Sequence, residues 1–296
     1  MNKKIMTMAT SLAVGGSLLF ATGFANASQI SGYDAYKGAI KDTKNLKNET
    51  ADIKVSVLDN GNNLVNLSSN VKLDLKSNSM SSVITVTKGT TSQTTNSYRQ
   101  DGKSINKNSS SDEYLVRTNN SKDFNKMDKV QNPTVEKSME VVADTLVGNM
   151  KDSVTTTSNT DGTKNIAINL SENEVTPLVD ALTQMAFIRT TNTENINENN
   201  SKNELGGLKN VLPQLQSDIK IQSVSSTGTI SKDDIITNQT AKIVVAGKDA
   251  QGTQHEMSIN IDLNLSNVNS TTPDKIDLTG KQVKEITSNM KRNFER

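Results

Sequence analysis

The sequence predicts an α+β protein that is mainly β, with a long, curved antiparallel sheet of about eleven strands covered by about three helices. Apolar and polar residues alternate from residue 253 to residue 265, so one face of this strand is dry and the other is wet. Apolar residues recur at helical spacing in three other segments, 31–46, 133–151 and 172–190. A sheet with one apolar face must cover it, and these helices can supply the cover.

The most regular pattern lies near the C-terminal end. The apolar side chains of the 253–265 strand share one face, namely Met257, Ile259, Ile261, Leu263 and Leu265. Ala241, Ile243 and Val245 alternate in the same way before it, and residues 248–252 join the two as a hairpin whose glycine supplies the positive φ of the turn. A third run begins at Ile219, so the segment from 218 to 265 is predicted to form a meander.

The N-terminal half is likewise predicted to contain a helix and a series of strands separated by turns. Tyr33, Tyr36 and Ile40 lie at helical spacing, which predicts a first helix over residues 31–46. Turn signals at residues 59–61 and 101–102 separate predicted strands. These strands are expected around residues 53–57, 65–75, 81–88, 92–100 and 113–117.

Two helices are predicted to flank a hairpin in the middle of the chain. Asn132 followed by Pro133 is typical of a helix start and opens the helix over 133–151. Residues 154–159 and 165–170 then form a hairpin around Asp161 and Gly162. Ser171 and Glu174 have the spacing of a capping box, which opens the helix over 172–190.

The ends of the chain differ in composition from the rest. Residues 1–27 have a charged start, an apolar middle and a small-x-small end, as in a secretory signal peptide cleaved before Ser28; an uncleaved anchor is the alternative. Residues 28–278 form the predicted domain, with a mobile loop near 190–206, and residues 279–296 form a basic tail, either frayed or a short helix. No other segment has the length and apolarity of a transmembrane helix.

Charge and cysteine content exclude several functions. The net charge is +1, and it becomes −1 when residues 1–27, which contain Lys3 and Lys4 and no acid, are removed. A nearly neutral chain lacks the basic stripe that a nucleic-acid partner requires. The absence of cysteine excludes disulfides, thiolate chemistry and a lipid-modified N-terminal cysteine.

No catalytic, metal or cofactor motif stands out. His255 is the only histidine, and a lone histidine near a strand end is expected to be a packed or rim residue. The acidic turns at 59–62 and 161–162 lack the ligand spacing and closing glutamate of a calcium loop. A chain with no tryptophan and four tyrosines is also poor in the rings that stack on sugars in glycosidases. We therefore expect no enzymatic activity, no metal and no cofactor.

The order of elements resembles that of the LolA/LppX-like family (lipoprotein-localisation-factor-like) of bacterial envelope proteins. Residues 52–57 followed by the turn at 59–61, and the closing hairpin over 231–265, are similar to passages of that family. The resemblance covers most of residues 31–265 and implies an eleven-stranded unclosed half-barrel covered by helices. It also implies a concave face that holds acyl chains, other lipids or a sensed partner. No site motif matches, so no functional residue is carried over.

The sequence thus predicts a secreted, envelope-associated, non-enzymatic protein that binds a lipid, acyl chain, acylated protein or other apolar ligand between sheet and helices. Flexible methionines favour an adaptable apolar site. The candidate lining residues are Met139, Leu146, Met150, Leu182, Met185, Met257, Ile259 and Ile261. The alternative is a cell-surface structural or protein-interaction module, with an envelope protein as partner, whose core is filled and holds no ligand.

Overall fold

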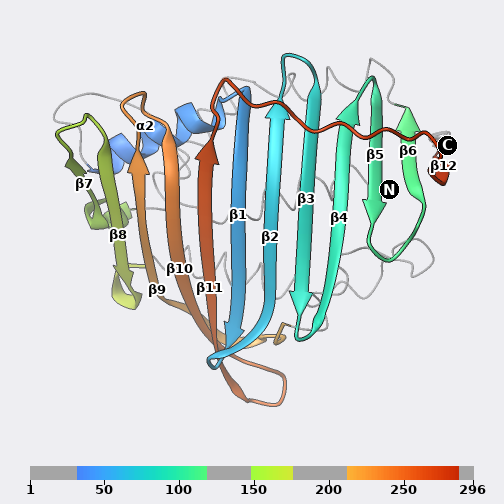
Figure 1. The fold of residues 1–296 in the computed structure, drawn as a ribbon. Helices are drawn as coiled ribbons and strands as arrows, with labels where there is room; N and C mark the ends of the chain where they lie inside the picture. Colours follow the sequence, from blue (N-terminus) through green and yellow to red (C-terminus); the bar gives the residue numbers. More distant parts are fainter. Residues whose placement is uncertain (1–31, 119–147, 176–211, 287–296) are drawn as a thin grey trace, which may run out of the picture.

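A computed structural model describes residues 32–118, 148–175 and 212–286. Within these ranges the chain forms one 12-stranded sheet in the order β12-β6-β5-β4-β3-β2-β1-β11-β10-β9-β8-β7 (Figure 1). All neighbours pair antiparallel except β12 and β6, which are parallel. The two edge strands do not pair with each other, so the sheet is unclosed. The prediction of a mainly β protein with an unclosed, largely antiparallel sheet is confirmed.

Most strands match the predicted ranges, whereas the strand over 103–108 had no predicted range of its own; the described part of the chain begins with helix α2 (Gly32–Lys44). The first sheet section consists of β1 (Asn48–Asp59), β2 (Asn62–Asp74), β3 (Ser79–Lys88), β4 (Thr91–Gln100), β5 (Lys103–Asn108) and β6 (Tyr114–Thr118). The second consists of β7 (Val154–Ser158), β8 (Lys164–Ser171), β9 (Ser217–Ile230), β10 (Ile236–Lys248) and β11 (Gln254–Ser266), followed by β12 (Val283–Glu285). The turns at Gly61, Gly102, Gly162 and Gly252 all have positive φ, as the turn signals required.

Strand β1 lies at the centre of the sheet, between β2 and β11. Val55 of β1 is opposite Leu67 of β2 on one side and Ile261 of β11 on the other. Lys54 is correspondingly opposite Ser68 and Asp262. Directly opposite residues point to the same face, so this register sorts apolar and polar side chains onto two different faces.

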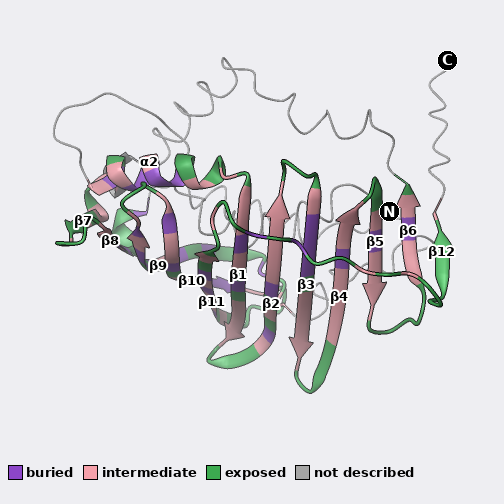
Figure 2. Ribbon diagram, turned by 45° about the horizontal axis from the view of Figure 1, so that its top comes forward, coloured by how far each residue is buried: buried purple, intermediate pink, exposed green. Residues whose placement is uncertain are grey.

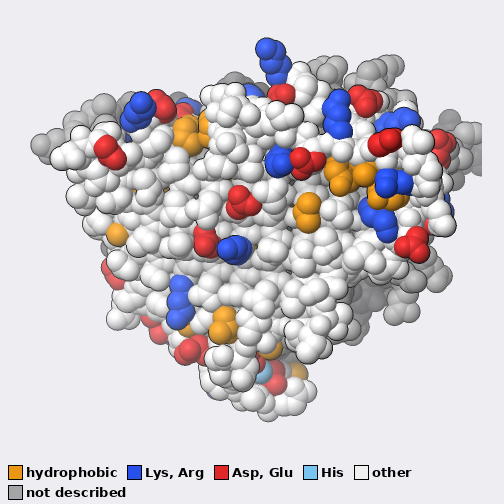
Figure 3. Space-filling view, in the orientation of Figure 1, with side chains coloured by type: hydrophobic (Ala, Val, Ile, Leu, Met, Phe, Trp, Pro, Cys, Tyr) orange, Lys and Arg blue, Asp and Glu red, His pale blue; other side chains and the backbone are white. Residues whose placement is uncertain are grey.

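The two faces have different character. We call the face against which α2 packs the helical face and the opposite one the polar face. The helical face carries Val55, Leu67 and their apolar neighbours, whereas over the centre of the sheet the polar face consists largely of serine, threonine and asparagine. Toward β4–β6 the polar face also carries Ile105 and Val116, which are 1% and 3% exposed. Figure 3 shows the polar face, with few charged or apolar side chains over its centre.

The main core lies where α2 packs on the helical face at the β7–β10 end of the sheet (Figure 2). Tyr36 and Ile40 of α2 are 1% and 3% exposed, and Met257 of β11 is 1% exposed. Ile219, Val245 and Leu215 pack in the same cluster. Burial of these side chains is the main favourable contribution to the stability of this end of the sheet.

A buried polar relay crosses this core. The Gln239 Nε2 donates to the Tyr36 hydroxyl and, at 3.0 Å, to the Ser226 Oγ, which in turn donates to the Thr240 carbonyl at 2.7 Å. Gln239 is 3% exposed, and burial raises the pKa of Tyr36 to about 12 although the Gln239 hydrogen bond lowers it. The relay satisfies polar groups that would otherwise be costly to bury and fixes α2 on the sheet.

A strap formed by residues 267–282 crosses the polar face from the end of β11 to β6, seen as the red coil in front of the strands in Figure 1. Asn48 holds its start through bonds to both the amide and the carbonyl of Thr271. Further along, the Ser81 Oγ accepts from the Asp274 amide, and Gln100 bonds both backbone groups of Ile276. The side chains of the strands thus satisfy the extended backbone of the strap.

The described residues contain one α-helix, α2, and two 3-10 helices, fewer helices than the three predicted. Residues 133–147 and 176–190 lie outside the described residues. The end of the first of these helices is a 3-10 helix, η1 (Gly148–Ser153), and the start of the second is a single 3-10 turn, η2 (Glu172–Glu174). The capping box between Ser171 and Glu174 forms as predicted, but Val175 is extended with ψ 126°, so η2 does not continue as an α-helix there. Pro177 follows soon after and disfavours helical backbone at the residue before it.

The tail also differs from its prediction over part of its length. Val283 and Ile286 have helical spacing, yet Val283–Glu285 forms strand β12. The amide of Ile286 donates to the carbonyl of Val116 at 2.8 Å, so pairing with the edge of β6 outweighs a weak local helical preference. Residues 287–296, the predicted signal peptide over 1–27 and the whole of the predicted loop at 190–206 lie outside the described residues. No helix in the described ranges has the length and apolarity to cross a membrane.

Candidate functional site

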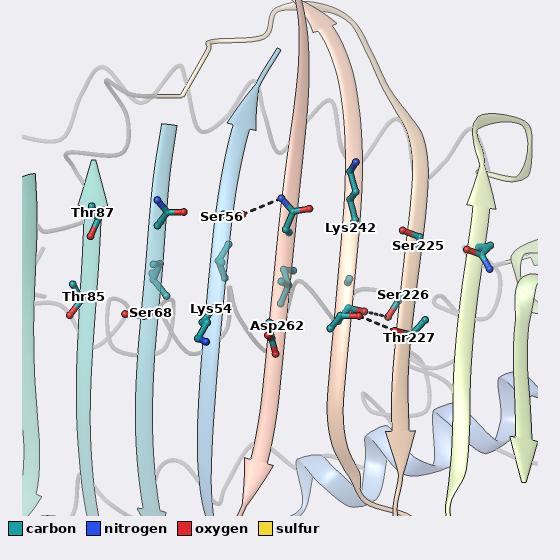
Figure 4. A pocket seen from close by; sticks show the side chains of 18 residues that line it. Lys54, Ser56, Ser68, Thr85, Thr87, Ser225, Ser226, Thr227, Lys242 and Asp262 are labelled. Atoms are coloured by element: carbon teal, nitrogen blue, oxygen red, sulfur yellow. Dashed lines mark hydrogen bonds between the residues drawn. The ribbon is translucent and has the colours of Figure 1, made fainter. Parts of the chain in front are cut away.

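A hollow of about 640 Å³ lies on the polar face, over the centre of the sheet (Figure 4). Thirteen of its lining side chains belong to the polar face, namely Lys54, Ser56, Asn66, Ser68, Thr85, Thr87, Asn169, Ser225, Thr227, Thr240, Lys242, Asn260 and Asp262. The residues between them, such as Val55 and Ile261, also line the hollow, although the register turns their side chains to the other face. The hollow therefore spans seven strands from β3 to β8.

The register arranges this lining in rows across the strands. One row runs through Ser68, Lys54, Asp262, Thr240 and Thr227, each directly opposite the next. The Thr227 and Thr240 hydroxyls lie 2.9 Å apart, and the Asp262 carboxylate accepts from the Asn264 amide at 2.8 Å. Neighbouring strands lie about 4.8 Å apart, so the hydroxyl and amide groups repeat at that spacing.

The hollow offers hydrogen-bonding groups and two free cations. Lys54 and Lys242 are exposed, and neither ammonium has a hydrogen-bond or ion-pair partner in the described part of the chain. Among the described residues, no aromatic ring lines the hollow. This lining suits a polar, hydrated ligand rather than an apolar one. The alternation of polar residues predicted a wet face, but the hollow itself depends on the pairing of seven strands, which no local pattern reveals.

The helical face extends beyond α2. Helix α2 contacts β7 and β10, at one end of the sheet. The apolar side chains of β11, β1, β2 and β3 continue the face toward the other end, where Val55, Leu67, Val71, Ile84, Val86 and Ile259 are half-buried. Within this stretch Ile53 and Leu263 form a small second buried cluster, and Ile261, Val65 and Met80 are buried as well.

The predicted lining residues fall into three groups. Met257 is part of the closed core against α2, while Ile259 is half-buried on the same strand and Ile261 is 5% exposed. Met150 lies in η1, and its side chain is outside the described part. Met139, Leu146, Leu182 and Met185 lie outside the described residues. The predicted apolar site therefore remains a prediction.

His255 lies between two carboxylates at the end of the sheet where β11 begins. Its Nδ1 is 2.9 and 3.0 Å from the Asp59 carboxylate oxygens, and its Nε2 is 3.5 Å from Asp249 Oδ2. Burial opposes protonation of His255, but the hydrogen bonds and charges of Asp59 and Asp249 outweigh it and raise its pKa. These contacts link the β1–β2 turn to the β10–β11 turn, so the arrangement is a clamp between strand ends.

The clamp makes stability depend on pH. Since the pKa of His255 is raised on folding, its contribution is full below the unfolded pKa of about 6.5 and is lost as pH rises through the folded value. We expect His255→Gln to cost more stability at about pH 5.5 than at about pH 9. Urea unfolding of both proteins at each pH measures this difference. An equal cost at both pH values would show that His255 contributes by packing alone.

In the described ranges, no three histidine or acidic side chains are grouped so that they could hold a metal ion. The acidic segments at Asp59 and Asp161, which were predicted to be turns and not calcium loops, are turns in the structure. At the second of them, Asp161 Oδ1 accepts hydrogen bonds from the Thr163 amide and hydroxyl. The hydrogen bonds of the His255 ring go to the two carboxylates and to no serine or threonine.

Comparison with known structures gives weak likenesses, among them the two that follow. No family model and no curated protein matches the chain. A LolA superfamily protein from Nitrosomonas europaea is similar with a TM-score of 0.22 and 7% identity, covering 84% of this chain and 96% of that one. A beta-barrel-like protein with a domain of unknown function from Brucella abortus has a TM-score of 0.18 and 8% identity, covering 75% of this chain and 98% of that one. At these values neither likeness bears on function.

Proposed function

We propose that the protein is a non-enzymatic binding protein that holds a lipid, an acyl chain or an acylated protein against the helical face of its sheet. The observation that supports this is the apolar surface of β11, β1, β2 and β3, which continues past α2 with several of its side chains only half-buried. An apolar ligand that covered Val55, Leu67 and Ile84 would remove this surface from water, worth roughly 25 cal/mol per Å².

The proposal places the mature protein outside the cytoplasm, secreted or held at the cell envelope. The support is the composition of residues 1–27, which is that of a secretory signal peptide. In that compartment lipids and acylated envelope proteins are the apolar ligands within reach.

A second candidate function is a surface interaction module without a ligand. The closed core against α2, where Leu215 and Ile230 are 0% exposed, supports this second function. The position of the hollow on the polar face, away from the helical face, supports it as well. In this case the hollow, with its hydroxyl and amide rows, would meet an envelope protein partner.

The two functions predict different behaviour of the purified mature chain. If the helical face binds lipid, a chain purified without detergent should carry extractable lipid, and added lipid should raise its melting temperature, since a ligand bound only by the native state stabilises it. Native mass spectrometry, solvent extraction and thermal shift with a lipid panel test this. Absence of both bound lipid and thermal shift would favour the interaction module.

A matched pair of variants locates the site. Leu67→Gln places a polar group on the helical face, and we expect it to weaken lipid binding about tenfold, because the lost burial of a leucine is worth about 1.5–3 kcal/mol. Ser68→Gln introduces the same glutamine side chain on the polar face and should leave the affinity for lipid unchanged. Titration with a fluorescent fatty acid compares the two; equal affinity would place the ligand elsewhere.

A further inference from the structure

Two arginines lie on the helical face in one row. Arg99 of β4 and Arg117 of β6 are both directly opposite Ser104 of the intervening strand β5. Strands are spaced by about 4.8 Å, so the two backbones are about 10 Å apart and both side chains rise from the same face. They are the only arginines in the described part of the chain.

Neither guanidinium has a hydrogen-bond or ion-pair partner in the described structure. Both side chains are half-buried, and burial lowers the pKa of Arg99. A charge withdrawn from water without a partner is costly, so such a pair is out of place in a face that serves only as core. Glu49 lies in the same row but three strands away from Arg99, roughly 14 Å, which is too far for an ion pair.

The arginines adjoin the apolar part of the same face. Moving from Arg99 toward the centre of the sheet, the same row continues through Met80 of β3 and Leu73 of β2. Val71 and Ile84 lie in the next rows. A ligand on this surface would meet cations at one end and, along the rest, aliphatic side chains with the buried serines Ser82 and Ser69 between them.

We propose that Arg99 and Arg117 bind the phosphate of an anionic phospholipid whose acyl chains lie along β1, β2 and β3. This inference rests on the proposed lipid-binding function and specifies the class of lipid. Arginine pairs with phosphate through two parallel N–H···O bonds, and two such groups on either side of Ser104 match the several oxygens of one phosphate. The phosphate supplies the missing charge, and the chains cover the half-buried apolar rows.

The test compares lipids that differ in headgroup and proteins that differ in one charge. Mature wild type, the Arg99→Gln/Arg117→Gln variant and a Lys103→Gln control are titrated with short-chain phosphatidylglycerol, phosphatidylcholine of equal chain length and inorganic phosphate. Lys103 neighbours Ser104 on β5 but belongs to the polar face, and it is exposed. Melting temperatures are measured without lipid as well.

Wild type and the control should bind phosphatidylglycerol about tenfold or more tighter than phosphatidylcholine, and the double variant should lose this preference. Without lipid, the double variant should melt at the same or a higher temperature, because it removes unpaired charge. A clear drop in melting temperature would instead assign the arginines to an acidic partner within this chain and overturn the inference. The inference would also be overturned if the double variant kept its full preference for phosphatidylglycerol over phosphatidylcholine, or if inorganic phosphate bound as tightly as the lipid. If wild type binds neither lipid, the proposed function itself fails; if it binds both equally, only the arginine assignment fails.

Discussion

Met257→Ala is expected to lower the free energy of unfolding by about 3 kcal/mol. Met257 is 1% exposed and packs in the core that α2 closes, so truncation leaves a cavity that its strand neighbours cannot fill without moving. The expected loss combines the lost transfer free energy of the side chain with the cost of that cavity. Urea unfolding followed by circular dichroism measures it.

Ile259→Ala is the matched control for this prediction. Ile259 lies two residues further on the same strand and face, but it is half-buried, so we expect a loss of about 1 kcal/mol. The comparison also separates core from ligand site. If Met257→Ala left stability unchanged and abolished lipid binding, Met257 would line an open site rather than the core.

Gln239→Glu is expected to cost about 3–5 kcal/mol at neutral pH. The change keeps the shape of the side chain but replaces the amide that donates to Tyr36 and Ser226 with a carboxylate that cannot donate. A charge would then be buried at a position that is 3% exposed. Chemical denaturation at neutral pH gives the magnitude.

The pH dependence of this variant provides the internal check. Burial raises the pKa of an introduced carboxyl group, so the loss should shrink as pH falls and the group takes up a proton. Gln239→Met removes the same two donated bonds without adding charge and should cost about 1–3 kcal/mol at every pH. A Gln239→Glu cost that did not change between about pH 7 and about pH 4.5 would contradict a buried carboxylate at this position.

Local sequence patterns predicted the strands well. The alternation from Met257 to Leu265 placed β11, and the turn residues at Asp101 and Asp161 placed two hairpins, because side-chain period and positive φ are local properties. Strand β12 was missed since its three residues are held by the edge of β6, whereas their spacing is helical. Here a tertiary contact outweighed a local preference.

The candidate sites were less predictable than the strands. The row that brings Arg99 and Arg117 together exists only through the register of three strands, and the polar hollow through that of seven. Nothing local to either arginine distinguishes it from a solvated cation. His255 was predicted as a packed or rim residue, and it is mostly buried at a strand end, but its pairing with Asp59 joins residues distant in sequence.

The central place of β1 has a consequence for how the chain folds. Its two partners are very different: β2 follows within a tight turn, but β11 is about two hundred residues further along. Until residues 254–266 pair with β1, one edge of β1 has unpaired backbone groups, and these can pair with non-native strands. Long-range pairing of this kind slows folding, because the entropy of closing the loop is lost before the contacts form.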